Sequence, residues 1–114
     1  MSSSGKQRVK DLKGKAFDIS ALVDYQNGAV VSREIIKKDT GTVTLFAFDK
    51  GQGLSEHTAP FDALVHILDG EARINISGKP VIVKKGKVII MPADKPHSLK
   101  AEKNFKMLLV MIKS

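Results

Sequence analysis

Three histidines are the side chains of this sequence best suited to chemistry at neutral pH: His57, His66 and His97. A histidine can transfer a proton near neutral pH, and its neutral ring nitrogen can bind a divalent metal. The sequence has no cysteine, which excludes disulfides, thiolate metal sites and a cysteine nucleophile. Any catalytic or metal site therefore depends on which histidines the fold brings together.

A glycine-rich segment, Gly51-Gln52-Gly53, follows a predicted strand as a dinucleotide-binding turn would. Glu56 stands where that motif has its third glycine, and no helix is predicted to follow, so the dinucleotide interpretation fails. The sequence also has neither a glycine–lysine–serine phosphate loop nor a serine nucleophile elbow. Serine hydrolase chemistry therefore has no support in the sequence.

Segments rich in β-branched and aromatic residues, separated by turn residues, predict an all-β domain. The expected strands cover residues 29–36, 42–49, 63–68, 71–77, 81–84, 87–91, 97–102 and 105–113. The last of these is apolar on both faces, so we expect it to be sandwiched between other parts of the chain. Asp69-Gly70 is expected at a hairpin tip, residues 51–62 as an irregular segment or strand end, and residues 19–23 as a single helical turn. About eight strands at this spacing predict a sandwich, a jelly roll or a small barrel.

Two histidine-bearing segments resemble the motifs of the cupin superfamily, whose members are double-stranded β-helix (jelly-roll) β-barrels of the RmlC-like type. The first family motif is a glycine, five residues, His-x-His, three or four residues, a glutamate, six residues and a glycine. The second is a glycine, five residues, Pro-x-Gly, two residues, a histidine, three residues and an asparagine. Here they read Gly51-QGLSE-His57-Thr58-Ala59-PFD-Ala63-LVHILD-Gly70 and Gly86-KVIIM-Pro92-Ala93-Asp94-KP-His97-SLK-Ala101. The resemblance covers roughly residues 40–112 and implies a small single-domain cupin barrel over residues 16–114.

In cupins that bind metal, the two histidines of the first motif, its glutamate and the histidine of the second motif hold a divalent ion. Here Ala59 stands at the second histidine position and Ala63 at the glutamate position, and neither side chain has an electron pair to donate. His57 and His97 alone fall short of the ligand sets typical of catalytic zinc and of the iron facial triad. We therefore expect no metal cofactor. The alternative is Zn, Mn, Ni or Fe held by His57 and His97, with water completing the coordination.

The resemblance implies that His57 and His97 approach each other on the interior face of the barrel and mark a small-molecule pocket. The expected lining of this pocket is His57, His97, Ala59, Ala63, Phe48 and Met91. The favoured function is small-molecule binding without metal-dependent catalysis, and the alternative is a metal-dependent dioxygenase, isomerase or decarboxylase. The two histidines could instead be half-buried hydrogen-bonding groups. His66, on the opposite face, is expected to pack or to lie in a dimer interface.

The net charge of +7 comes mostly from the N-terminal segment. Residues 1–15 carry five basic residues against one acidic residue, a net +4, and the other 99 residues carry +3. We expect residues 1–15 to form a flexible basic arm. Nucleic acid is not an expected partner, because 16 of the 19 basic residues are lysine and few aromatic residues are available to stack on bases. A regulatory or nucleic-acid role of the arm is the weakest alternative.

The length of 114 residues, 42% of them hydrophobic, fits one domain with its own core. No stretch approaches the ~18 apolar residues of a membrane span, and the first residues lack the apolar core of a signal peptide. We therefore expect a cytoplasmic protein without membrane contact. The apolar strands at 29–36 and 105–113 favour a homodimer, which the resemblance to small cupins also implies.

Overall fold

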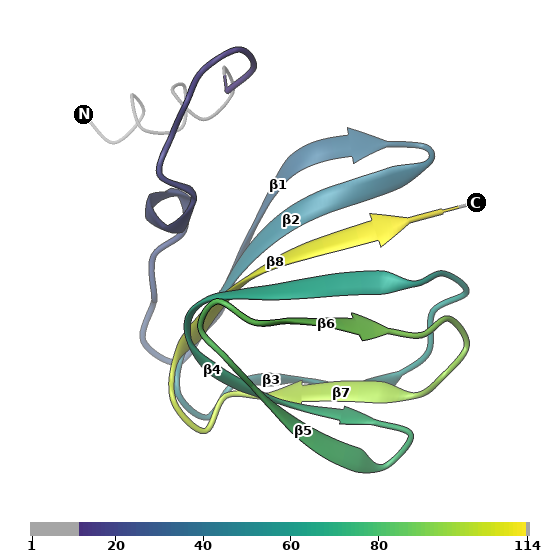
Figure 1. The fold of residues 1–114 in the computed structure, drawn as a ribbon. Coiled ribbons are helices and arrows are strands. Elements are labelled where there is room, and N and C mark those ends of the chain that lie inside the picture. The colour runs from purple at the N-terminus through teal and green to yellow at the C-terminus, as the bar shows by residue number, and fades with distance from the viewer. Residues whose placement is uncertain (1–11, 114) are drawn as a thin grey trace.

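Eight antiparallel strands and one short helix make up the computed structural model, which describes residues 12–113 (Figure 1). The strands are β1 (Val30–Lys38), β2 (Gly41–Phe48), β3 (Gly53–His57), β4 (Ala63–Ile76), β5 (Lys79–Lys84), β6 (Val88–Met91), β7 (His97–Lys100) and β8 (Phe105–Ile112). The helix, η1 (Ile19–Leu22), is a single 3₁₀ turn, and the Asp18 carboxylate at its start accepts a hydrogen bond from the Ser20 backbone nitrogen. The predicted all-β fold and the predicted helical turn near residues 19–23 are both confirmed.

The strands form one strongly curled sheet in the order β1-β2-β8-β4-β7-β3, with β5 and β6 also paired to β4. The long strand β4 belongs to both sides of the curl. Its first half pairs with β6 and β8, and its second half pairs with β5 and β7. Figure 1 shows β1, β2, β8 and β6 on one side of the barrel and β3, β5 and β7 on the other. This is the jelly-roll barrel that the resemblance of the two histidine-bearing motifs implies.

Asp69-Gly70 lies inside β4, so the predicted hairpin tip at these residues is wrong. Gly70 does have a left-handed φ of 71°, but the chain uses it to bend one strand, where the pairing with β8 shifts register between Ile67 and Asp69. A positive φ suits an irregular strand as well as a two-residue turn, which is why the dipeptide misleads. The turn between β4 and β5 lies instead at Ser77 and Gly78, whose φ angles are 51° and 79°.

The segment 51–62 is more regular than predicted, because it contains strand β3. This strand pairs with β7 from Gly53 opposite Lys100 to His57 opposite His97. Its two neighbouring glycines, Gly51 and Gly53, are atypical of a strand, so the sequence did not predict one here. Gly53 is nevertheless needed for the pairing, because a Cβ there would collide with the Leu99 carbonyl oxygen of β7. At the other end of the chain, β8 pairs with β2 and β4 within the sheet. Its Met107 belongs to the interior core, and its Leu108 packs in a separate cluster with Leu45 and Ala47.

Strand β2 buries side chains on both of its faces. Phe48 points into the barrel, where its ring stacks on Phe105 with centroids 4.6 Å apart. Leu45 and Ala47 point outward and are also fully buried, because the N-terminal segment around Val23 packs over them. The barrel therefore has an interior core and a second apolar layer on part of its outer face.

Tyr25 ties this outer layer to the bend of β4. Its hydroxyl donates a 2.6 Å hydrogen bond to the Asp69 carboxylate. The Lys106 ammonium lies 5.2 Å from the centre of the Tyr25 ring and donates a 2.7 Å hydrogen bond to the Ser20 carbonyl oxygen. Burial of Tyr25, followed by the hydrogen bond and negative charge of Asp69, raises the pKa of Tyr25 well above its ordinary value, because each effect disfavours the phenolate.

Tyr25 is the single tyrosine of a chain without tryptophan, so the tyrosinate absorbance of this protein reports that residue alone. We expect little tyrosinate in the native protein at about pH 10, where the urea-unfolded chain is half ionised. The unfolded state then loses its proton first, so the contribution of Tyr25 to the free energy of unfolding is complete below about pH 10 and falls above it. Tyr25→Phe should remove that part of the pH dependence from thermal melts. Native ionisation at about pH 10 would contradict the part-buried hydrogen bond from Tyr25 to Asp69.

Residues 12–113 include no helix that is long and apolar enough to span a membrane. The cytoplasmic location and the domain boundaries stay predictions. Of the predicted basic arm over residues 1–15, residues 1–11 lie outside the described residues. Within the described part, the Lys15 backbone nitrogen donates a 3.3 Å hydrogen bond to the Leu12 carbonyl oxygen and closes a turn.

Candidate functional site

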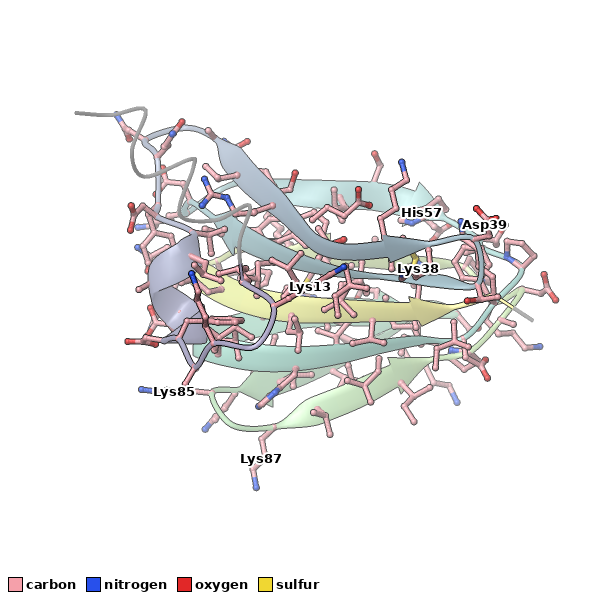
Figure 2. All side chains as sticks on the ribbon, turned by 90° about the horizontal axis from the view of Figure 1, so that it is seen from above. Lys13, Lys38, Asp39, His57, Lys85 and Lys87 are labelled. Atoms are coloured by element: carbon pink, nitrogen blue, oxygen red, sulfur yellow. The ribbon has the colours of Figure 1, made fainter. Side chains whose placement is uncertain are left out.

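The structure brings His57 and His97 together on adjacent strands. The two residues are register partners at the end of β3 and the start of β7. Their ring centroids lie 4.4 Å apart with the planes inclined at 66°, an edge-to-face arrangement. His97 is buried, with 5% of its surface exposed, whereas His57 is exposed. Figure 2 shows His57 at the same end of the barrel as Asp39 of the β1–β2 turn.

Backbone carbonyl groups fix the orientation of both rings. His57 Nδ1 lies 2.8 Å from the Ser55 carbonyl oxygen, and His97 Nδ1 lies 3.2 Å from the Lys95 carbonyl oxygen. A carbonyl oxygen can only accept, so Nδ1 is the donor in each ring. In the neutral form, Nε2 of each ring therefore keeps a lone pair that can accept a hydrogen bond from a ligand.

Two loops hold the histidines at this end of the barrel. Residues 58–62 connect β3 to β4, and residues 92–96 connect β6 to β7. The Asp62 carboxylate accepts a 2.8 Å hydrogen bond from the Ala93 backbone nitrogen, and the Ala59 carbonyl oxygen accepts one of 2.8 Å from the Asp94 backbone nitrogen. Asp94 occupies the glycine position of the second motif and has a φ of 62°, the left-handed conformation that aspartate tolerates better than most residues.

A row of inward-facing side chains forms the opposite wall. The register aligns Thr42, Met111, Ala63 and Met91 across β2, β8, β4 and β6. Thr42, Ala63 and Met91 are buried. This row belongs to the end of the barrel that carries the histidines, because Ala63 and Met91 adjoin the same two loops as His57 and His97.

Thr42 is a candidate site residue that the sequence reasoning missed. It is 7% exposed, and its hydroxyl oxygen has no hydrogen-bond partner among the residues that the structure describes. Buried hydroxyls normally have partners, because an unsatisfied one costs about 1–3 kcal/mol. The available signal was the period of two: Thr42 shares the inward face of β2 with Phe46 and Phe48, so a threonine here interrupts an apolar face.

The structure gathers most, but not all, of the predicted pocket residues. Those at the histidine end of the barrel are His57, His97, Ala59, Ala63 and Met91. Phe48 lies six residues along β2 from Thr42, roughly 20 Å away along the strand, and stacks on Phe105 in the core. His66 faces the outer side of the sheet, opposite Val88 and Leu108.

The side chains present do not fit the four-ligand metal site of metal-binding cupins. Ala59 and Ala63 offer methyl groups at two of the four ligand positions. Within residues 12–113, no group of three or more His, Cys, Asp or Glu side chains could hold a metal ion. Two neutral imidazoles supply neither the number of ligands nor the negative charge that a tightly bound divalent ion requires. His57 and His97 are therefore considered below as hydrogen-bonding groups.

A family model for the cupin domain matches residues 44–113. Among solved structures, a conserved protein of unknown function from Streptococcus pyogenes is 38% identical over 89% of this chain and 89% of its own, with a TM-score of 0.85. A cupin superfamily protein from Desulfitobacterium hafniense is 26% identical over 90% of this chain and 94% of its own, with a TM-score of 0.84.

A cupin 2 conserved barrel domain protein from Leptotrichia buccalis is 46% identical over 85% of this chain and 47% of its own, with a TM-score of 0.83. No curated protein matches the chain. The family match spans more than half of the sequence and contains both histidine-bearing motifs. It also agrees with the barrel architecture of residues 12–113. The chain therefore belongs to the cupin family.

Proposed function

We propose that the protein binds a small polar molecule at the His57–His97 pair, without metal-dependent catalysis. The observation that supports this function is the geometry of the pair. The rings lie 4.4 Å apart, and each is oriented through Nδ1 so that Nε2 remains for a ligand. The buried His97 ring needs a hydrogen-bond partner for Nε2, and a ligand with an O–H or N–H group supplies one.

The opposite wall narrows the class of ligand. Ala63 and Met91 are apolar and suit the carbon skeleton of a small molecule. The buried Thr42 hydroxyl can donate or accept a hydrogen bond and has no partner of its own in the described chain. The proposed ligand is therefore small and carries polar groups at two positions, one for the imidazoles and one for the threonine.

A ligand screen by NMR on the full chain tests this function. The probes are small hydroxy acids, amides and polyols, and the readout is the ring signals of the three histidines. A compound that binds should shift the signals of His57 and His97 and leave that of His66 unchanged. Thr42→Val should weaken its binding by up to about tenfold, the loss of one hydrogen bond, and His66→Gln on the outer face is the matched control. Compounds that shift His66 alone, or none that shifts the pair, would contradict the proposal.

A second candidate function is that of a metal-dependent cupin enzyme, such as a dioxygenase, an isomerase or a decarboxylase. One observation favours it: metal-binding histidines usually donate their second ring nitrogen to a carbonyl or carboxylate, as Nδ1 of both His57 and His97 does here. Calorimetric titration of the wild-type chain with Zn or Mn discriminates the two functions. Tight binding that disappears in His57→Ala would favour the enzyme.

We also propose that a second copy of the chain covers part of the outer face. A row of apolar side chains crosses four strands there, formed by Ile90, Leu64, Val110 and Val43. Ile90 and its neighbour Val88 are more than half exposed, which is unusual for large apolar side chains on one patch. Sedimentation velocity should give a dimer that Ile90→Glu dissociates. Ile82→Glu on β5, an apolar residue of similar exposure outside this row, should leave it intact.

A further inference from the structure

A cavity lies outside the barrel, between the N-terminal segment and β1. Its volume is about 400 Å³, and its apolar lining includes Leu12 and Phe17 from the segment and Ile35 and Ile36 from the strand. It shares no residue with the histidine pair or with the wall opposite it. Its size is at the lower end of the range of small-molecule pockets, ~300–1,000 Å³.

An irregularity in β1 creates the apolar side of this cavity. Side chains of a regular strand alternate between faces, so two consecutive isoleucines would point to opposite sides. Here the pairing with β2 shifts register between Glu34 and Ile36. Ile35 packs in the outer apolar layer, and Ile36 lies opposite Val43, an outward-facing residue of β2. The irregular register thus lets both isoleucines contribute to the outer side of the sheet.

The apolar lining is only partly covered by the described chain. Ile36 is 51% exposed and Phe17 is 43% exposed. Large apolar side chains that remain this open beside a cavity favour a ligand with an apolar body, because burying them removes apolar surface from water.

Three lysines complete the lining: Lys13, Lys37 and Lys38. Within residues 12–113, no acidic side chain lines the cavity and none of these three ammonium groups forms an ion pair. Figure 2 looks onto this face: Lys13 and Lys38 lie over it, whereas Lys85 and Lys87 project from another edge of the molecule. A cavity with an apolar floor and only positive charges at its rim is complementary to a ligand with an apolar chain and an anionic head.

We propose that this outer cavity binds a free amphipathic carboxylate, an alkyl chain of medium length with one anionic end. The alkyl chain lies on Phe17, Ile35 and Ile36, and the carboxylate lies beside Lys13 and Lys38. Lys38 is two residues along β1 from Ile36 and shares its outward face, whereas Lys37 lies opposite Thr42. This binding is separate from the function proposed for the histidine pair.

Decanoate, below its micelle-forming concentration, is the probe. Calorimetric titration of the full chain should show one saturable site, and NMR shifts should be confined to residues 12–17 and 35–38. Decanol, which lacks the charge, and butyrate, which lacks the chain, should each bind at least about tenfold more weakly, since both parts of the ligand contribute. Raising the salt concentration should weaken the binding of decanoate more than the binding of decanol.

A matched pair of charge-reversal variants provides the control. Lys13→Glu with Lys38→Glu should weaken decanoate binding by at least about tenfold, because two attractive charges become repulsive. Lys85→Glu with Lys87→Glu makes the same change in net charge at the other edge and should alter binding by less than about threefold, since distant surface charges are screened. His97→Ala should have no effect, so this inference and the proposed function can fail independently.

Three results would overturn the proposal. One is the absence of saturable decanoate binding. Another is an equal loss in both lysine pairs, which would show attraction to net charge only. The third is binding to anionic phospholipid vesicles that exceeds binding of monomeric decanoate, which would assign the lysines and isoleucines to a membrane surface instead.

Discussion

Ala59→His combined with Ala63→Glu is expected to give this protein a stoichiometric site for Zn, Mn, Ni or Fe. The two substitutions add a nitrogen and a carboxylate to His57 and His97, at the end of the barrel where both histidines already lie. Loss of a single outer partner of a metal ligand costs about 10- to 100-fold in affinity. Two additional direct ligands should therefore tighten binding by more than about 100-fold over wild type, as measured by calorimetric titration.

The charge of the new carboxylate needs its own control. Ala63 is buried, so a glutamate there should destabilise the metal-free barrel. Ala59→His with Ala63→Gln has nearly the same shape without the charge and should gain much less affinity. Saturating metal should raise the melting temperature of the glutamate variant, because a ligand that binds only the native state stabilises it. No gain of metal binding would mean that side chains at positions 59 and 63 do not reach the histidine pair as the motif spacing implies.

Gly70→Ala is expected to destabilise the barrel by more than about 3 kcal/mol, which combines backbone strain with overpacking. Gly70 has a φ of 71°, and a Cβ there would collide with the Asn104 carbonyl oxygen and lie 3.1 Å from Phe105 Cα. Neither obstacle is the end of a flexible side chain, so the backbone itself would have to move. Thermal unfolding should occur more than about 10 °C below the wild-type midpoint.

Gly78→Ala is the matched control for this effect. Gly78 also has a left-handed φ, of 79°, but a Cβ there would meet nothing within 4 Å. Gly78→Ala should lower the free energy of unfolding only by the cost of the strained backbone, about 1 kcal/mol. Equal losses in the two variants would show that the close approach of β4 and β8 at Gly70 does not limit stability.

Much of the barrel could be predicted from the period of the apolar residues. The alternation in residues 71–77 and the doubly apolar segment 105–113 correspond to the second half of β4 and to β8. The dipeptide Asp69-Gly70 misled the prediction, because a left-handed glycine serves a bent strand as well as a hairpin turn. Whether the strand turns back or continues depends on its distant partners, β6 and β8, which local sequence does not specify.

The candidate site was predictable only in part. The spacing of two motifs indicated that His57 and His97 would approach each other, and their rings do lie 4.4 Å apart. Their unequal burial was not predictable, because it depends on loops 58–62 and 92–96. Thr42 was not predicted, because it stands out only through its buried hydroxyl, which has no hydrogen-bond partner in the described chain. That property depends on packing and cannot be read from the residue type. Phe48 was predicted to line the pocket because an aromatic residue suits a pocket as well as a core, and the structure places it in the core.

The position of β8 has a consequence for the order in which the barrel can form during synthesis. In the sheet, β8 is the only strand that joins the β1–β2 hairpin to β4, yet among the described strands it is the last to be made. While it is still inside the ribosome, the emerging hairpin and the β4 segment present unpaired edges and half of an apolar core. Exposed edges of this kind favour association with other chains. A nascent chain whose β8 has not left the ribosome should therefore depend on chaperones, whereas the released full-length chain should not.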